Sequence, residues 1–216
     1  MTKFKTSNFR EIKAGKIFLK TLYRSNHPIF NKRQVKDLVL SANEAKIQTI
    51  INLSDSAAAL KPGLLHCPWY KKLYNSKNVV TLDISMNFDI TDALFLKKIK
   101  RGIKFMLKRT PPYLIHCQVG IDRTGFFAIL LESFMEASLS EMAKDYMLSY
   151  VAPDEYSKTD DELGSEFVLN IISKICGRTL SSSDDIYNAA YKYLKDKVKL
   201  KNHELLELKN ILSGKY

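Results

Sequence analysis

The sequence has few cysteines, and none stands at the spacing of a metal or disulfide motif. Cys67, Cys117 and Cys176 are an odd number without a CxxC pair, which argues against a disulfide framework. The four histidines are scattered, so a structural zinc site is not expected. Nucleotide-binding P-loop and dinucleotide fingerprints are missing too. We therefore expect a protein that uses no metal and no other cofactor.

Long apolar runs are also missing. A membrane-spanning helix needs about 20 consecutive apolar residues, whereas the run from Phe126 to Leu131 ends at Glu132. The first residues, MTKFKTSNFREIK, contain no apolar stretch of the kind found in secretory signal peptides. We expect a cytoplasmic protein, although secretion without a cleaved signal would leave no trace in the sequence.

Acidic residues are in the minority: the chain has 23 of them and 34 lysines and arginines, which gives a net charge of +11. Such a charge attracts phosphates, acidic peptides, anionic membranes or nucleic acid. Lysines on helical faces, as at Lys97, Lys98, Lys100 and Lys104, are typical of a solvated surface. No basic stripe is interleaved with aromatic residues, so we expect no nucleic-acid partner. Peripheral contact with an anionic membrane stays open, and the sequence indicates no oligomeric state.

The alternation of short apolar runs with longer helical periods predicts an α/β fold. Strands are expected at residues 16–23, 47–53, 79–86 and 113–117. Helices are expected at residues 33–45, 92–108, from about 124, and at 140–150, 160–175, 184–199 and 203–212. We expect one domain over residues 1–216, with a core at about 8–176 and a helical C-terminal extension at about 177–216.

Residues 116–125, HCQVGIDRTG, are the most informative segment, because Cys117 is followed six positions later by Arg123. Gly120 supplies the backbone freedom of a tight loop, and consecutive N–H groups can then form a nest for a phosphate dianion. The N-terminus of the following helix adds positive potential, and Arg123 can donate two parallel hydrogen bonds to phosphoryl oxygens. The predicted phosphate-binding residues are Gln118, Val119, Gly120, Ile121, Asp122, Arg123 and Thr124.

Cys117 is the predicted nucleophile. A cysteine that faces N–H dipoles, a helix N-terminus and a guanidinium reacts as a thiolate. It can attack phosphorus and form a phosphocysteine, which water then hydrolyses. Thr124 would offer its hydroxyl to the sulfur, and His116 would orient the loop through backbone hydrogen bonds. These residues together predict a cysteine-dependent phosphatase.

A second His-Cys pair serves as an internal comparison. Pro68 follows Cys67 directly, and Leu73 stands where an arginine would be needed. Cys67 is therefore predicted to be a packing residue, as most isolated cysteines are.

The loop resembles the HCxAGKDRTG signature of the bacterial tyrosine phosphatases that also hydrolyse phosphoinositides. Further segments are similar to those of the same family: an NFRD-like segment at Asn8–Glu11, an RS pair at Arg24–Ser25, a strand end at Ile50–Ser54, a DYxxS stretch at Asp145–Ser149, and YLKDKV near Tyr193. The resemblance covers most of the chain. It implies a central, mostly parallel sheet of four to five strands flanked by helices, with a helical C-terminal region.

Two departures from the family pattern lie inside the loop. Val119 replaces an alanine, and Ile121 replaces a lysine that the family associates with highly charged substrates such as phosphoinositides. Ser54 replaces an arginine outside the loop. The resemblance therefore implies phosphotyrosine as the substrate, with dual specificity or lipid phosphates as further options.

Two aspartates compete for the role of general acid, which is worth about 10²–10⁴ in rate. The resemblance implies Asp122, inside the loop. Other cysteine phosphatases use an aspartate on a separate loop, and Asp89 stands 28 positions before Cys117. Either residue can also be structural, Asp122 as a loop brace and Asp89 as a turn residue. Arg24 would contact the substrate phosphate, brace the loop, or form a surface ion pair.

Other functions fit the same loop less well. A phosphoinositide or inositol phosphate phosphatase is the first alternative. A catalytically silent phosphate-binding module is another, although such a module has no need of a nucleophile. A sulfurtransferase or arsenate reductase also uses a loop thiolate, but no resolving cysteine lies near Cys117 in the sequence.

Overall fold

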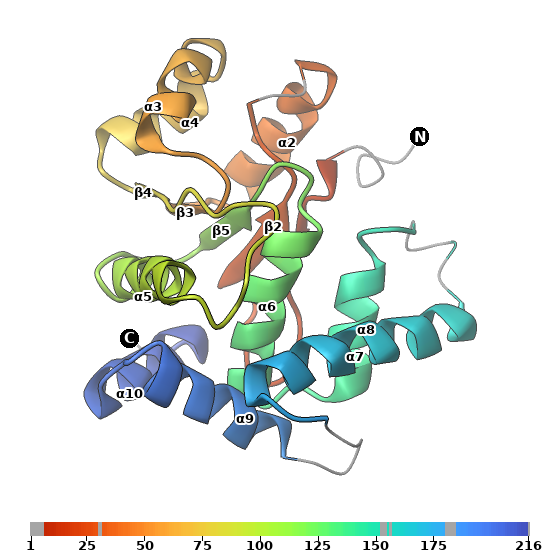
Figure 1. Ribbon diagram of the computed structural model, residues 1–216. Helices are drawn as coiled ribbons and strands as arrows, with labels where there is room; N and C mark the ends of the chain where they lie inside the picture. The colour runs from red at the N-terminus through yellow and green to blue at the C-terminus, as the bar shows by residue number, and fades with distance from the viewer. Residues whose placement is uncertain (1–6, 30–31, 152–154, 156, 180–184, 216) are drawn as a thin grey trace.

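A five-stranded sheet forms the centre of the protein, described by a computed structural model of residues 7–29, 32–151, 155, 157–179 and 185–215 (Figure 1). The strands are β1 (Arg10–Glu11), β2 (Leu22–Ser25), β3 (Thr49–Asn52), β4 (Val79–Thr81) and β5 (Tyr113–His116). Their order is β1-β2-β5-β3-β4. β1 pairs antiparallel with β2, and all other pairs are parallel. The expected α/β fold with a mostly parallel sheet is confirmed.

Helices cover both faces of the sheet. They are α2 (Lys32–Glu44), α3 (Ala57–Leu60), the 3₁₀ helix η1 (Lys61–His66), α4 (Pro68–Asn75), α5 (Ala93–Leu107), α6 (Asp122–Phe134), α7 (Leu139–Met147), α8 (Lys158–Cys176), α9 (Ile186–Lys192), the π-helical η2 (Tyr193–Lys197) and α10 (Asn202–Leu212). Side chains alternate between the two faces of a strand. Ile50 and Leu114 therefore pack with α2, α3 and α4, while Ile51 and Ile115 pack with α5 and α6.

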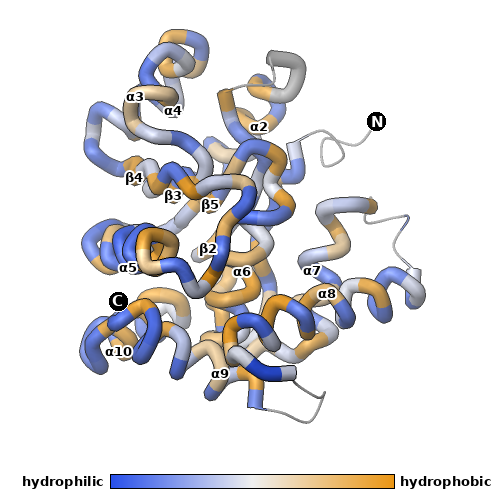
Figure 2. The backbone as a smooth tube through the Cα atoms, in the orientation of Figure 1, coloured by the Kyte–Doolittle hydropathy of each residue, from blue (hydrophilic) through white to orange (hydrophobic). Residues whose placement is uncertain are grey.

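Helix α6 is the central helix of the second layer. Every residue from Arg123 to Phe134 is buried, because the sheet, α7 and α9 surround the helix (Figure 1). Its hydropathy is correspondingly high along most of its length (Figure 2). The C-terminal helices complete this layer, since α9 lies against α6 and α10 against α5. Leu194 and Leu208 belong to the same apolar core as Phe127.

No helix among the described residues combines the length and apolar content needed to cross a bilayer. The first six residues of the chain, on which the signal-peptide expectation partly rested, lie outside the described residues.

Two strand predictions were wrong in their bounds. The strand expected at 16–23 begins only at Leu22, because Lys20 adopts a left-handed conformation with φ 62°. The strand expected at 79–86 ends at Thr81, and Asp83, with φ 52°, turns the chain away. β1 and the helices between residues 57 and 75 were not predicted at all.

Candidate active site

The loop that was expected to bind phosphate lies at the carboxyl end of the central strand. β5 ends at His116, α6 begins at Asp122, and five residues connect them. Cys117 starts this loop and is only 2% exposed. Its Sγ accepts a hydrogen bond from the backbone N–H of Gly120 at 3.2 Å. The sulfur is thus held at the base of the loop and receives a backbone dipole.

Gly120 fits this loop for two physical reasons. Its φ is 82°, a conformation that residues with a Cβ rarely adopt. A Cβ at this position would stand 2.5 Å from the carbonyl oxygen of Ser25 at the end of β2. The loop can therefore approach the neighbouring strand this closely only with glycine at position 120.

Two side chains bind the carbonyl oxygen of Gly120 from outside the loop. Arg24 donates to it at 2.9 Å and Asn8 at 3.1 Å. In a trans peptide the next N–H points away from the carbonyl. Holding the Gly120 carbonyl outward therefore directs the N–H of Ile121 toward the inside of the loop. No side chain within the described part of the chain caps the start of α6, so its first N–H groups add to the same positive potential.

Arg123 closes the loop from the first turn of α6. One guanidinium nitrogen donates to the carbonyl oxygen of Ile84 at 2.9 Å, and the residue is 6% exposed. Its Nε has no hydrogen-bond partner among the described residues. The guanidinium is therefore held in place by one bond and keeps donor capacity for an anion.

The hydroxyl of Thr124 was expected to contact the sulfur of Cys117. Thr124 is fully buried, and its hydroxyl has no hydrogen-bond partner among the described residues. The donor to the sulfur is the Gly120 N–H instead.

A buried ion-pair network stands behind Arg24. Asp145 on α7 accepts hydrogen bonds from Arg24 and, at 2.8 Å, from the Nε of Arg10 on β1. Arg10 also donates to Ser149 at 3.0 Å. Burial alone would raise the pKa of Asp145, but the two guanidinium groups outweigh it and lower that pKa below its usual value.

This network joins the segments that carried the family resemblance. The NFRD-like segment supplies Asn8 and Arg10, the RS pair supplies Arg24, and the DYxxS stretch supplies Asp145 and Ser149. Alone, the NFRD-like segment and the RS pair were weak signals, and the DYxxS stretch was a moderately specific one. Together they form the support of the Gly120 carbonyl, so Arg24 braces the loop and forms no surface ion pair.

Glu132 on α6 lies near the charges of this network but forms no hydrogen bond with them. Both of its carboxylate oxygens are buried and lack a hydrogen-bond partner among the described residues. Burial raises the pKa of Glu132 well above its usual value, and the charge of Asp145 adds to the effect. Sequence reasoning gave no signal for this residue.

Replacing Asp145 by asparagine is expected to lower the free energy of unfolding by about 3–5 kcal/mol at pH 7, because two buried guanidinium groups lose their counter-charge. The pKa of Asp145 is lower in the folded protein than in the unfolded chain. Its carboxylate therefore stabilises the fold above about pH 4, and this contribution is lost as the pH falls through the folded-state pKa. Urea unfolding at pH 7 and pH 3 should show the difference between wild type and variant shrinking at the lower pH.

Glu132→Gln is the matched control, because it removes a buried carboxyl that has no ion-pair partner. Its expected effect at pH 7 is below about 1 kcal/mol. An equal loss in both variants, or a difference for Asp145→Asn that does not change with pH, would mean that the ion pairs give no net stabilisation.

A second buried polar network supports the other side of the loop. His116 lies 2.9 Å from the hydroxyl of Tyr70, and its Nδ1 is 3.4 Å from the carbonyl oxygen of Cys117. The backbone N–H of His27 donates to the carbonyl oxygen of Gln118 at 3.2 Å. Burial, followed by the charge of His27, lowers the pKa of His116 well below its usual value. His116 is therefore neutral near pH 7, because a charge on this fully buried ring would be costly.

Both candidate acids are exposed and line the same cavity of about 660 Å³ beside the loop. Asp89 accepts hydrogen bonds from the backbone N–H and the hydroxyl of Thr91, both at 2.8 Å. These bonds lower the pKa of Asp89 and favour its ionised form. Asp122 is the first residue of α6, and its carboxylate accepts no such hydrogen bond from the described residues. Four of the residues that line this cavity are aromatic: Phe88, Phe126, Tyr146 and Phe167.

The remaining loop residues use their backbone. Gln118 and Val119 are exposed, and Ile121 is half-buried. Among the described residues, no cluster of three or more histidine, cysteine, aspartate or glutamate side chains could hold a metal ion.

A cysteine and an arginine that bracket a loop between the central strand of a parallel sheet and a buried helix define a class: the cysteine-based protein tyrosine phosphatase superfamily. Within it, this chain belongs to the tyrosine phosphatase family, whose model matches residues 5–214. Family and fold are those of a hydrolase that acts on phosphoesters. The predicted resemblance is thereby confirmed.

Among solved structures, the chain is similar to the core catalytic domain of the PP-IP phosphatase SIW14 from S. cerevisiae, in complex with citrate. The two share 18% sequence identity with a TM-score of 0.43, over 79% of this chain and 91% of that one. A comparison with curated proteins finds no match.

Proposed function

We propose that this protein hydrolyses phosphotyrosine through a phosphocysteine intermediate. The observation that carries the proposal is the position of the Cys117 sulfur, which receives the Gly120 N–H in the loop just before α6, while Arg123 stands in the first turn of that helix. A thiolate is stabilised by such dipoles, and a phosphate dianion by the same groups.

In the proposed reaction the Cys117 thiolate attacks the phosphorus, and the bond between phosphorus and the leaving oxygen breaks. Asp122 gives its proton to the leaving oxygen, while Arg123 and the loop N–H groups stabilise the charge on the phosphoryl oxygens. Asp122 then accepts a proton from a water molecule that attacks the phosphocysteine. Inorganic phosphate leaves, and the thiolate and the protonated Asp122 are restored.

The aromatic cavity favours an aryl leaving group. Phe88, Tyr146 and Phe167 can pack against a phenol ring, and aromatic pairs contribute about 0.5–1.5 kcal/mol beyond the burial of their area. Of the described residues that line this cavity, Lys174 alone is basic. A single lysine favours a substrate with one phosphate group over a polyanionic one.

The alternative substrate is a phosphoinositide or inositol phosphate, which the net charge of +11 favours. Against it stands Ile121, which takes the place of the family's loop lysine. A silent binding module would need neither Cys117 nor an acid next to Arg123.

Phosphate release should therefore rank phosphotyrosine peptides and aryl phosphates above phosphothreonine peptides and phosphoinositides. Phe167→Ala is expected to raise KM for a phosphotyrosine peptide about 3- to 10-fold, because one stacking wall is lost. Leu163→Ala is the matched control, since Leu163 lies on the same helix α8, is 50% exposed against 49% for Phe167, and does not line the cavity. Phosphoinositide turnover that exceeds phosphotyrosine turnover would support the alternative instead.

A further inference from the structure

Helix α5 and the two residues after it carry charge of one sign only. Residues 93–109 contain seven basic residues and no acidic one: Lys97, Lys98, Lys100, Arg101, Lys104, Lys108 and Arg109. Several of these stand four positions apart, and like charges at this spacing destabilise a helix. The sequence alone suggested an ordinary solvated surface here, but solvated helix faces commonly carry charges of both signs. The repulsion within α5 does not stabilise the helix, which points to a role for this charge outside the folding of the chain.

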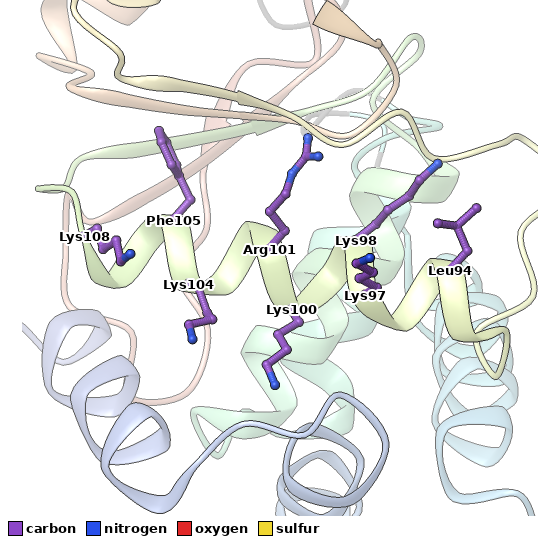
Figure 3. Close-up of a pocket in the computed structure, with 8 residues that line it drawn as sticks. All are labelled: Leu94, Lys97, Lys98, Lys100, Arg101, Lys104, Phe105 and Lys108. Atoms are coloured by element: carbon purple, nitrogen blue, oxygen red, sulfur yellow. The ribbon is translucent and has the colours of Figure 1, made fainter.

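The basic side chains form an outward face on α5. Lys97, Arg101, Lys104 and Lys108 follow one another at i, i+4, i+7 and i+11, so their Cβ atoms lie on one side of the helix, from which the side chains spread in different directions. Figure 3 shows that Lys100 and Lys104 point toward the C-terminal helices, whereas Arg101 and Phe105 point the opposite way. The side chains labelled in Figure 3 line a shallow groove of about 590 Å³ along α5.

The chain itself neutralises only part of this face. Lys104 pairs with Glu204 at 3.0 Å, and Lys98 lies 4.0 Å from Asp83. Lys97, Arg101 and Lys108 are exposed and pair with no acidic side chain among the described residues. The C-terminal region adds further charge, because Lys100 donates to the carbonyl oxygen of the exposed Lys199 at 2.6 Å.

One end of the basic face reaches the rim of the candidate active site. Leu94 and Lys98 line the groove and also a neighbouring hollow that includes Ile84 and Asp89. The carbonyl of Ile84 is the group that holds Arg123. Leu94 is 58% exposed, so an apolar side chain stands where the basic face meets this rim.

We propose that the outer face of α5 docks on the surface of an anionic phospholipid bilayer. Basic clusters of about four to eight residues on a helix bind anionic lipid headgroups, and exposed leucines insert at the headgroup boundary. Lysines outnumber arginines here, whereas sequence-reading nucleic-acid sites favour the arginine fork. Phe105 is half-buried and covered by the Arg109 guanidinium at 5.1 Å, so it offers no platform for base stacking.

The test is co-sedimentation of the full-length protein with vesicles of phosphatidylcholine alone or with 30 mol% (about one lipid in three) phosphatidylserine. The wild-type protein should sediment with the mixed vesicles and stay in the supernatant with the neutral ones. The variant Lys97→Gln, Arg101→Gln, Lys108→Gln should bind the mixed vesicles about 100-fold less, from about five-fold for each charge. Its stability should equal or exceed that of wild type, because like-charge pairs are removed.

A variant with the same change in net charge provides the control. Lys61, Lys71 and Lys72 are exposed on η1 and α4, at the opposite face of the sheet, and their replacement by glutamine should weaken vesicle binding only a few-fold. Equal losses in both variants, no binding by wild type, or α5-dependent binding of duplex DNA or RNA in preference to the vesicles would each overturn the proposal. Vesicle binding is measured without turnover, so it stands or falls separately from the proposed catalytic activity.

Discussion

Cys117→Ser is expected to lower the turnover of an aryl phosphate by at least about 10⁴-fold, as the removal of a covalent nucleophile does in other enzymes. The serine hydroxyl is not ionised at neutral pH and has no base beside it in the described residues, so no phosphoenzyme forms. The N–H groups of the loop and Arg123 are untouched. Binding of phosphate or vanadate should therefore persist, which calorimetry can measure on the same preparation.

Cys67→Ser is the matched control for this experiment. Cys67 is as buried as Cys117 and also follows a histidine, but it packs in the apolar cluster beneath α2 and α4. Burial raises the pKa of its thiol and keeps it protonated. The control should lose about 1 kcal/mol of stability and keep its turnover. More than about 1% residual activity in Cys117→Ser, with full activity in the control, would exclude the phosphocysteine mechanism.

Asp122→Asn is expected to lower turnover of a substrate with a poor leaving group by about 10²–10⁴-fold. A good leaving group, such as an activated phenol, needs little protonation, so its turnover should fall far less. Asp89→Asn should change both substrates by less than about three-fold, because the Thr91 hydrogen bonds lower the pKa of Asp89 and keep it ionised.

The comparison of substrates with poor and good leaving groups identifies the general acid. If the selective loss for poor leaving groups followed Asp89→Asn instead, Asp89 would be the donor and Asp122 a residue that supports the loop. Circular dichroism of both variants checks that neither substitution has changed the fold.

The loop was readable from sequence because each of its residues has a local task. Gly120 needs a left-handed backbone, and Cys117 and Arg123 need to stand on either side of a turn into a helix. The ion-pair network that supports this loop could not be predicted from the sequence. Arg10 and Asp145 are separated by 135 positions, and nothing in either segment indicates the other.

The strand errors have a similar origin. An alternating apolar pattern cannot reveal that Lys20 or Asp83 adopts a left-handed backbone, because both residues usually occur in other conformations. Glu132 could not be assigned from the sequence either. In the sequence Glu132 ends an apolar run, which predicts an exposed residue, whereas the structure buries it completely.

The outward position of the Gly120 carbonyl, held by Arg24 and Asn8, has a consequence for how this enzyme class can diversify. Phosphate recognition in such a loop depends on backbone N–H groups, while the side chains of Gln118 and Val119 are exposed. The loop can therefore exchange side chains, as it does at Val119 and Ile121 relative to the family signature, and still present the same cradle of amides. Under the proposed mechanism, exposed side chains of the loop meet the substrate while backbone N–H groups hold the phosphate. Substitutions in this segment can then change substrate choice without loss of phosphate binding.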